Sequence, residues 1–263
     1  MQFAHQYTIS AVDILYDYEG SVEAGTSYHR IIDRIAPIES PVIISGESGL
    51  LKESVLRTIH SRSPRSNKAC LSISPGFLLA LIKSGIHSSV DNSSARTPAS
   101  GNGFFERGDG GSIILCRLHE FTAEEQSLVA ALMESPRAKP LGNSDPVPFA
   151  VRLMCCAHPD AVTTASAVAA YVQKAKGSLI SVLPLRSTPE DIPRLSQKLL
   201  SRQAPRKYFG ENVLAALREY DWRLNLAQLM RLIYRLHAAA PGDILELRDL
   251  KAALSDKEVV TDE

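Results

Sequence analysis

Short runs of buried-type residues alternate with amphipathic helical segments over roughly the first two thirds of the chain. Residues 42–44 form a continuous Val-Ile-Ile run that ends at a glycine-rich turn, a pattern typical of a buried parallel strand. Helical spacing of apolar residues begins at about residue 51. Two further strand-like runs, GSIILC and PFAVRLMCCA, are separated by a helical segment that opens with the capping-box pair Thr122 and Glu125. This alternation predicts a parallel sheet with helices on both faces.

The pattern becomes helical throughout after LPLR. Pro189 follows Thr188 in the position of a first helical residue, which predicts a helix start there. The run NLAQLMRLIYRLHAAA predicts a second helix with Asn225 as its N-cap, and LRDLKAAL predicts a third. We therefore expect an α/β domain over residues 1–189 and a small helical domain over residues 190–263 that ends in the polar tail SDKEVVTDE.

Composition narrows the function classes. The chain has 29 Lys and Arg and 29 Asp and Glu among 263 residues, so no net charge favours nucleic acid or anionic lipid, and autonomous DNA binding is not expected. No apolar run approaches the roughly 20 residues that span a bilayer, and the first residues lack the features of a signal peptide. The four cysteines match no zinc spacing. We therefore expect a cytoplasmic protein without a membrane segment or a metal site.

Five blocks in order resemble the central domain of bacterial sigma-54-dependent transcriptional activators, also called enhancer-binding proteins. GESGLLKE is similar to the family's nucleotide loop GESGTGKE, and GFFERGDGGSIILCRLHEF to G-x-FE-x-A-x-GGTLFLDEI. VRLMCCAHPD resembles VRIIAATNRD, LPLRSTPEDIP resembles LPPLRER-x-EDIP, and DWRLNLAQL occupies the place of WPGNVREL. The resemblance covers residues 24–250. It implies a doubly wound AAA+ α/β fold with a C-terminal helical lid, hexameric rings, and ATP bound between subunits.

The nucleotide loop keeps most of its expected residues. A phosphate-binding loop needs small residues, so that backbone N–H groups can close around phosphate, and a lysine for the terminal phosphates. The position of the glycine before the lysine is Leu51, whose branched side chain should obstruct either the backbone geometry or the approach of phosphate. The loop is then either an ordinary turn or a weak site for ATP or ADP. The matching residues are Gly46, Glu47, Ser48, Gly49, Lys52 and Glu53.

The two carboxylates that the family uses for hydrolysis are absent. An Asp that holds Mg²⁺ and a Glu that polarises water would lie at the end of the second strand, where this chain has Cys116 and Arg117. A neutral thiol is no ligand for a hard cation, and a guanidinium cannot accept a proton from water. Glu120 lies past the strand end. For Arg117 we weigh a surface ion pair against a phosphate contact.

Further positions that the resemblance makes catalytic have also changed. The sensor pair Thr-Asn is Ala157 and His158. An ungapped count places the two arginines that reach the neighbouring subunit at Val168 and Lys174, and the lid arginine at Ala227. Lysine keeps a charge but lacks the bidentate fork of arginine. The resemblance thus points to a kept fold and a lost reaction.

The loop that touches sigma-54 is missing as well. The family carries GAFTGA between the first two blocks, but residues 87–103 read HSSVDNSSARTPASGNG, which predicts a flexible loop or a disordered insertion. We therefore expect a non-hydrolysing regulatory or assembly protein that needs no cofactor and cannot activate sigma-54 directly. Its expected partner is a paralogous AAA+ activator or a second copy of itself. A switch that binds nucleotide without turnover, and an ATPase with relocated residues, are the alternatives.

Overall fold

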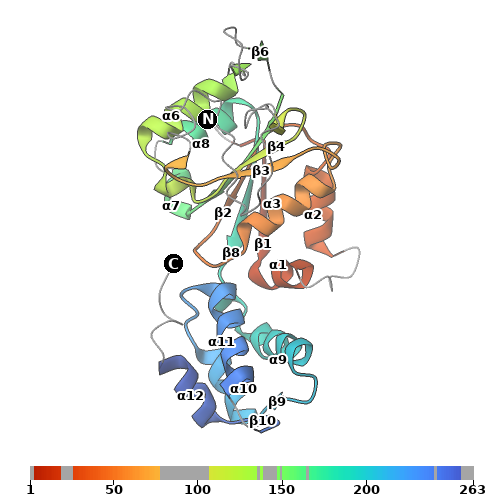
Figure 1. The fold of residues 1–263 in the computed structure, drawn as a ribbon, viewed down its shortest axis with the longest axis vertical. Helices are drawn as coiled ribbons and strands as arrows, with labels where there is room; N and C mark the ends of the chain where they lie inside the picture. The colour runs from red at the N-terminus through yellow and green to blue at the C-terminus, as the bar shows by residue number, and fades with distance from the viewer. Residues whose placement is uncertain are drawn as a thin grey trace, which may run out of the picture. The chain divides into compact units, whose positions relative to one another are not determined.

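The chain forms two compact units, shown in Figure 1. The first unit comprises residues 1–7, 25–45 and 52–181, and the second comprises residues 8–24, 46–51 and 182–263. The predicted loop 87–103, the match at Phe105 and Glu106, and the polar tail from residue 256 lie outside the described residues. The computed structural model describes residues 3–18, 26–77, 107–134, 137–138, 147–148, 150–163, 166–239 and 242–255.

A six-stranded sheet with the order β1-β8-β2-β7-β4-β3 forms the centre of the first unit. Strands β8, β2, β7, β4 and β3 pair in parallel, and Ile43 of β2 lies between Cys155 of β7 and Leu179 of β8. Because strands later in the chain flank β2 on both sides, the sheet is doubly wound, and its ligand crevice is expected at the carboxyl ends of the strands. The strands are β1 (His5–Ser10), β2 (Val42–Ser45), β3 (Cys70–Ile73), β4 (Ser112–Leu115), β7 (Arg152–Ala157) and β8 (Ser178–Leu183).

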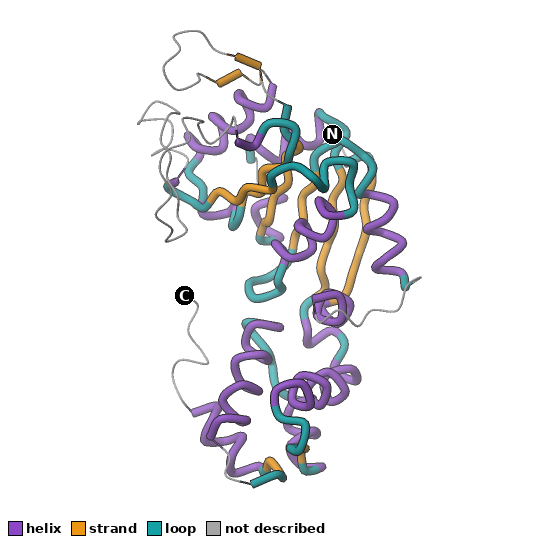
Figure 2. The backbone as a smooth tube through the Cα atoms, turned by 45° about the vertical axis from the view of Figure 1, so that its right-hand side comes forward, coloured by secondary structure: helices purple, strands orange, loops and turns teal. Residues whose placement is uncertain are grey.

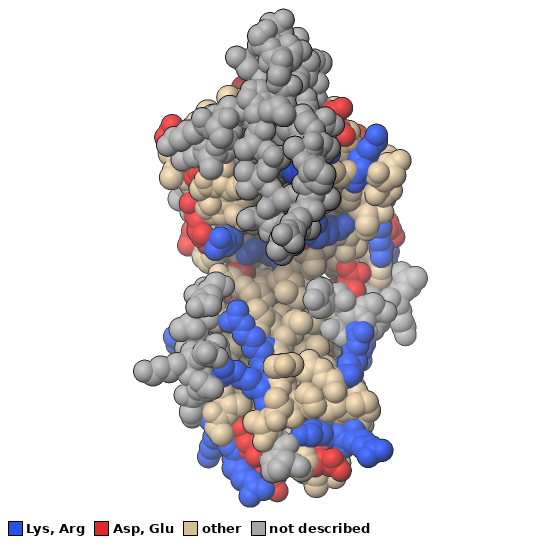
Figure 3. All heavy atoms as spheres, in the orientation of Figure 1, with Lys and Arg blue, Asp and Glu red and all other residues tan. Residues whose placement is uncertain are grey.

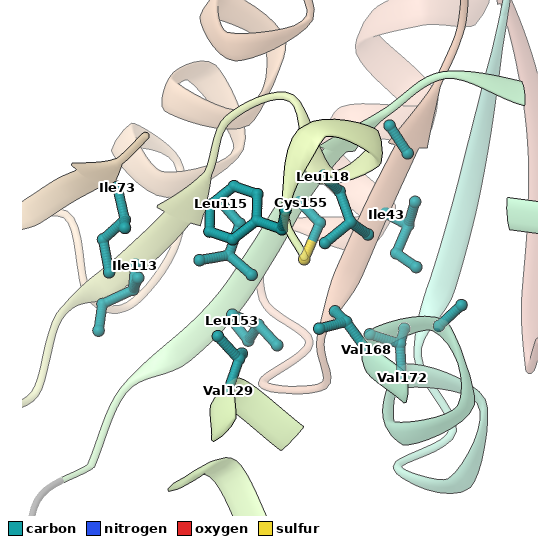
Figure 4. Packing of buried hydrophobic residues seen from close by; sticks show 13 residues of the cluster. Ile43, Ile73, Ile113, Leu115, Leu118, Val129, Leu153, Cys155, Val168 and Val172 are labelled. Atoms are coloured by element: carbon teal, nitrogen blue, oxygen red, sulfur yellow. The ribbon is translucent and has the colours of Figure 1, made fainter. Parts of the chain in front are cut away.

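Helices cover both faces of this sheet (Figure 1). One face packs a hydrophobic cluster against α6 and α8, and Figure 4 shows Leu153 and Cys155 of β7 pointing into it beside Val129 and Val168. On the other face α3 contacts β2, β4 and β7. The helices are α2 (Ser27–Ile35), α3 (Lys52–Ser61), α6 (Ala123–Glu134), α7 (Pro159–Thr163) and α8 (Ala167–Lys174), with the 3-10 turn η1 (Leu118–Glu120) and a short antiparallel pair, β5 (Arg137–Ala138) and β6 (Val147–Pro148).

A buried arginine joins this sheet to the end of α2. Arg152 at the start of β7 is 2% exposed, and its guanidinium donates to the carbonyl oxygens of Ile35, Ala36 and Ser40 at 3.0 to 3.1 Å. Burial lowers the pKa of Arg152 to about 10. The cation is stabilised by the carbonyl end of a helix, where the helix dipole is negative.

The second unit is mainly helical, as the purple segments at the lower end of Figure 2 show. Helix α11 packs against α9, α12 and α1, and Trp222 before it is fully buried, with its indole N–H donating to Leu217 O at 2.8 Å. Strands β9 and β10 pair in parallel. The elements are α1 (Ala11–Tyr18), η2 (Leu185–Ser187), η3 (Pro189–Asp191), α9 (Ile192–Gln203), β9 (Tyr208–Phe209), α10 (Glu211–Glu219), α11 (Asn225–Ala239), β10 (Ile244–Leu245) and α12 (Leu247–Ser255).

The predicted α/β class with a C-terminal helical domain is confirmed. The capping box is also confirmed, because Thr122 N–H donates to the Glu125 carboxylate at 2.9 Å and Glu125 N–H donates to the Thr122 hydroxyl at 3.2 Å. Two local details differ. A 3-10 turn follows Thr188, so α9 begins at Ile192, and the Asn225 side chain bonds to distant segments rather than to its own helix. Within the described residues, no helix is long and apolar enough to cross a membrane.

Candidate functional site: a phosphate loop and its catalytic positions

The loop of residues 46–51 follows β2 at the carboxyl edge of the sheet. Gly49 and Leu51 have φ angles of 75° and 51°, in the left-handed region that favours glycine. Leu51 thus takes a left-handed conformation at a position where the resemblance implies a glycine, at a cost of roughly 1–2 kcal/mol. The leucine strains the loop but does not prevent its turn, and Leu50 beside it is buried.

Helix α3, which follows the loop, places a polar cluster beside the end of β4. The Glu53 carboxylate accepts hydrogen bonds from the Ser72 hydroxyl at 2.7 Å, from the Cys116 thiol at 3.2 Å and from Arg57 at 2.6 Å. Partial burial works against the charge, but these donors together lower the pKa of Glu53 below its ordinary value. Arg57 also donates to Ser72 at 2.7 Å. The cluster therefore holds one anion and its own cation.

The resemblance of the sequence to the family implies a metal-binding carboxylate at the position of Cys116. Burial, together with the adjacent Glu53 carboxylate, raises the pKa of Cys116 to about 12. The thiol is therefore protonated at neutral pH and donates a hydrogen bond to Glu53. A protonated thiol does not coordinate Mg²⁺, which requires oxygen ligands. The residues present at this position do not fit the magnesium ion of an ATPase.

Arg117 turns away from the strand edge into a surface ion pair. Its backbone is left-handed, with a φ of 55°, and its guanidinium lies 3.3 Å from the Glu120 carboxylate. The Arg117 side chain is 56% exposed, so water screens this pair and its contribution to stability is small. Arg117 is thus an exposed cation at the position where the resemblance implies a water-activating carboxylate.

Two imidazoles lie together beyond β4 and β7. The ring centroids of His119 and His158 are 5.8 Å apart, and His158 Nδ1 lies 3.2 Å from the Asp160 carboxylate. Partial burial and the nearby cations lower the pKa of His119. Ala157, which ends β7, is fully buried and offers no polar side chain. Among the residues that the structure describes, no group of three or more His, Cys, Asp or Glu could hold a metal ion.

The positions counted as trans arginines lie at opposite ends of α8 and differ in exposure. Val168 is fully buried in the hydrophobic cluster of Figure 4, where it packs the domain rather than facing outward. Lys174 in the last turn of α8 is on the surface and forms an ion pair with Glu134 at 2.6 Å. At the lid position, Ala227 in the first turn of α11 has a methyl group in place of a cationic side chain.

Sequence reasoning missed the residues that surround the loop and the strand end. Arg57, four residues after Glu53 in α3, could have been found as a helical ion pair. Ser72 carries no signal in the sequence, because its role depends on β3 lying beside β4. Asn225 was predicted only as a helix cap, although its side chain bonds to the loop.

The fold and the loop position together define an AAA+ domain with a helical lid. A model of the sigma-54 interaction domain matches residues 19–170, and a model of the AAA+ ATPase lid domain matches residues 186–263. The chain therefore belongs to the sigma-54 interaction domain family.

Curated relatives and solved structures agree with this assignment. The chain is 28% identical to the hydrogenase transcriptional regulatory protein HoxA of Cupriavidus necator, over 88% of this chain and 49% of HoxA. It is 26% identical to the response regulator protein PilR of Pseudomonas aeruginosa, over 84% of this chain and 52% of PilR. It thus spans about half of these relatives. A crystal structure of NtrX from Brucella abortus in complex with ATP shares the fold, with a TM-score of 0.69 at 22% identity, over 87% of this chain and 55% of that one.

Proposed function

We propose that this protein is a non-hydrolysing member of the sigma-54 interaction domain family that acts through contacts with other proteins. The observation that carries the proposal is the protonated Cys116 thiol, which donates to Glu53 where an ATPase needs a metal-binding carboxylate. Without the metal and the water-activating carboxylate, most of the electrostatic stabilisation of phosphoryl transfer is absent.

Independent changes support the same conclusion. The cation of Arg117 takes the place of the water-activating carboxylate, and Ala157 and Ala227 lack the polar and cationic groups of the family's sensor and lid. These sites serve separate steps, so a single relocated residue cannot replace them all. Meanwhile the described residues of the sheet and of the lid form buried apolar cores. A folded body without its reaction favours a binding role.

The partner we propose is a transcription regulator of the same family, or a second copy of this chain. The curated relatives are transcriptional regulators, and this chain has the two segments that match the family's AAA+ domain and lid. A subunit of this kind in a ring with active neighbours would present Lys174 where an arginine is expected. Loss of a trans arginine lowers related reaction rates by about 10³-fold or more. We therefore propose that it slows the mixed ring, and that it neither activates sigma-54 nor binds DNA alone.

A nucleotide-binding switch is the second candidate, and one observation favours it. The loop keeps the left-handed conformation at both Gly49 and Leu51, so its turn has the form expected of a phosphate loop. The solved NtrX structures of similar fold include complexes with ATP and with ADP. Titration with fluorescent ATP and ADP separates the two candidates, because only the switch binds them at millimolar concentration or below.

Hydrolysis is tested by phosphate release in the presence of ATP and Mg²⁺. We expect wild-type turnover to equal that of Lys52→Ala, and the double variant C116D/R117E to remain inactive because the sensor and lid residues are still missing. Turnover of the wild type well above Lys52→Ala would refute the proposal.

The proposed partner is tested by mixing. Purified protein is added to active family members from the same host while ATPase rate and open-complex formation are followed. Slower hydrolysis at substoichiometric amounts supports the mixed ring, whereas stimulation, or transcription activation by this protein alone, contradicts it.

A further inference from the structure

The phosphate loop is bound by side chains of the helical unit to which it belongs. Arg186 in η2 donates from Nη1 to one carboxylate oxygen of Glu47 at 2.7 Å and from Nη2 to the other at 2.5 Å. This is a bidentate arrangement, which fixes orientation as well as charge. Glu47 is thus engaged through both oxygens by a residue 139 positions away in the sequence.

Asn225 at the start of α11 connects three segments of this unit. It is fully buried, and its Oδ1 accepts from Leu185 N–H at 2.8 Å. Its Nδ2 donates to Ser48 O at 2.9 Å and to Glu47 Oε2 at 3.2 Å. Both halves of the carboxamide are therefore used, and the loop, the η2 turn and α11 share one buried polar residue. Asn225 is costly to remove, because the buried N–H of Leu185 would lose its hydrogen bond away from water.

The backbone of the loop also lies against the first turn of α11. Ala227 N–H donates to Gly49 O at 3.0 Å. A Cβ atom added to Gly49 would lie 1.9 Å from Leu224 O, so only glycine permits this approach. The contact is between main-chain atoms and leaves the loop little freedom to move away from α11.

We propose that Glu47, Arg186 and Asn225 form a latch that holds the phosphate loop in one conformation without nucleotide, so that this loop does not respond to ATP or ADP. A ligand shifts a conformational equilibrium only by its differential affinity for the two states. When protein contacts already select one state of the loop, a phosphate group has nothing further to order. This inference rests on the proposed function, since a loop fixed in advance suits a subunit that has no reaction cycle.

Hydrogen exchange of the full chain tests the latch directly. Exchange of the peptide that covers residues 46–51 reports local opening of the loop, and it is measured by mass spectrometry without nucleotide, with ATP and Mg²⁺ at about 5 mM, and with ADP and Mg²⁺ at about 5 mM. The variants are Arg186→Ala and Asn225→Ala. The matched control is Arg218→Ala, which removes an exposed arginine of the same unit that lies 3.4 Å from Glu190 and outside the latch.

We expect the wild-type loop to exchange at the same rate in all three conditions. Arg186→Ala should raise the rate about fivefold and Asn225→Ala by about tenfold or more, whereas Arg218→Ala should leave it unchanged. A wild-type loop that nucleotide protects, or an unchanged rate in Arg186→Ala, would overturn the latch. Far-UV circular dichroism shows whether Asn225→Ala folds, and Arg186→Ala decides the question if it does not.

The two proposals fail in different ways. If the wild type releases phosphate faster than Lys52→Ala while exchange of the loop is unaffected by nucleotide, the proposed function is refuted and the latch is supported. If nucleotide slows exchange of the loop while the protein shows no ATP turnover, the latch is refuted and the absence of hydrolysis is supported.

Discussion

Replacement of Cys116 by aspartate should destabilise the protein in a pH-dependent manner. The change removes a thiol that donates to Glu53 at 3.2 Å and puts a second carboxylate in its place. Two unit charges repel with about 4 kcal/mol at a separation of about 4 Å and an effective dielectric constant of about 20. The Glu53 side chain is 40% exposed, so solvent screening reduces this to about 2 kcal/mol. The lost hydrogen bond adds about 1 kcal/mol.

The sign of the pH dependence follows from the repulsion. Each carboxylate opposes ionisation of the other, so the folded variant holds a proton at a pKa above the unfolded value of about 4. The folded state then binds more protons than the unfolded state, and stability falls as pH rises through the raised pKa. The free energy of unfolding of Cys116→Asp should thus lie near that of the wild type at pH 4 and about 3 kcal/mol below it at pH 8.

Urea denaturation followed by circular dichroism measures these differences. Cys116→Ser is the matched control, because its hydroxyl keeps a neutral donor beside Glu53, and it should stay within about 1 kcal/mol of the wild type at both pH values. Equal stability of Cys116→Asp and the wild type at pH 8, without added divalent cation, would refute the assignment of Cys116 as a neutral hydrogen-bond donor.

Three further predictions concern other sites. Leu51→Gly relieves the strain of the left-handed conformation but adds conformational entropy to the unfolded state. These effects oppose each other, so thermal denaturation should show a change in the free energy of unfolding of less than about 1 kcal/mol. A much larger loss of stability would contradict the strain at Leu51. Glu125→Ala should cost about 2 kcal/mol in urea titration, because the 1% exposed carboxylate accepts from Gly76 N–H as well as from its own helix start. Burial lowers the pKa of His60, whose ring forms a hydrogen bond with Ser112 at 2.9 Å, so the free energy of unfolding should fall as pH drops below about 6.5. His60→Gln should make the free energy of unfolding less dependent on pH in this range. An unchanged pH profile in this variant would show that His60 is not the source of the dependence.

Surface charge agrees with the composition of the chain. Lys and Arg lie close to Asp and Glu on the visible face of each unit in Figure 3, and formal net charge is zero. Ion pairs among the described residues include Arg117 with Glu120 and Lys174 with Glu134.

Features that depend on residues close together in the chain could be predicted from residue types and spacing. The run Val-Ile-Ile at 42–44 predicted β2 because a strand buried on both faces is apolar at every position. The Thr122 and Glu125 pair predicted the start of α6 because a capping box closes within four residues. That Cys116 and Arg117 stand in place of two catalytic carboxylates stays a prediction from the resemblance; it rests on residue type, since a thiol and a guanidinium cannot perform the chemistry of carboxylates.

The contacts of Cys116 and Asn225 depend instead on how distant parts of the chain pack together. The thiol of Cys116 meets Glu53 across 63 residues because α3 packs beside β4, and no local pattern encodes that contact. Asn225 has the residue type of a helix cap. Folding instead buries it beside Ser48, which is 177 residues away in the sequence, and its side chain donates to the Ser48 carbonyl oxygen. A buried amide must satisfy its hydrogen bonds wherever the packing puts it, so its role follows from three-dimensional neighbours rather than from its own helix.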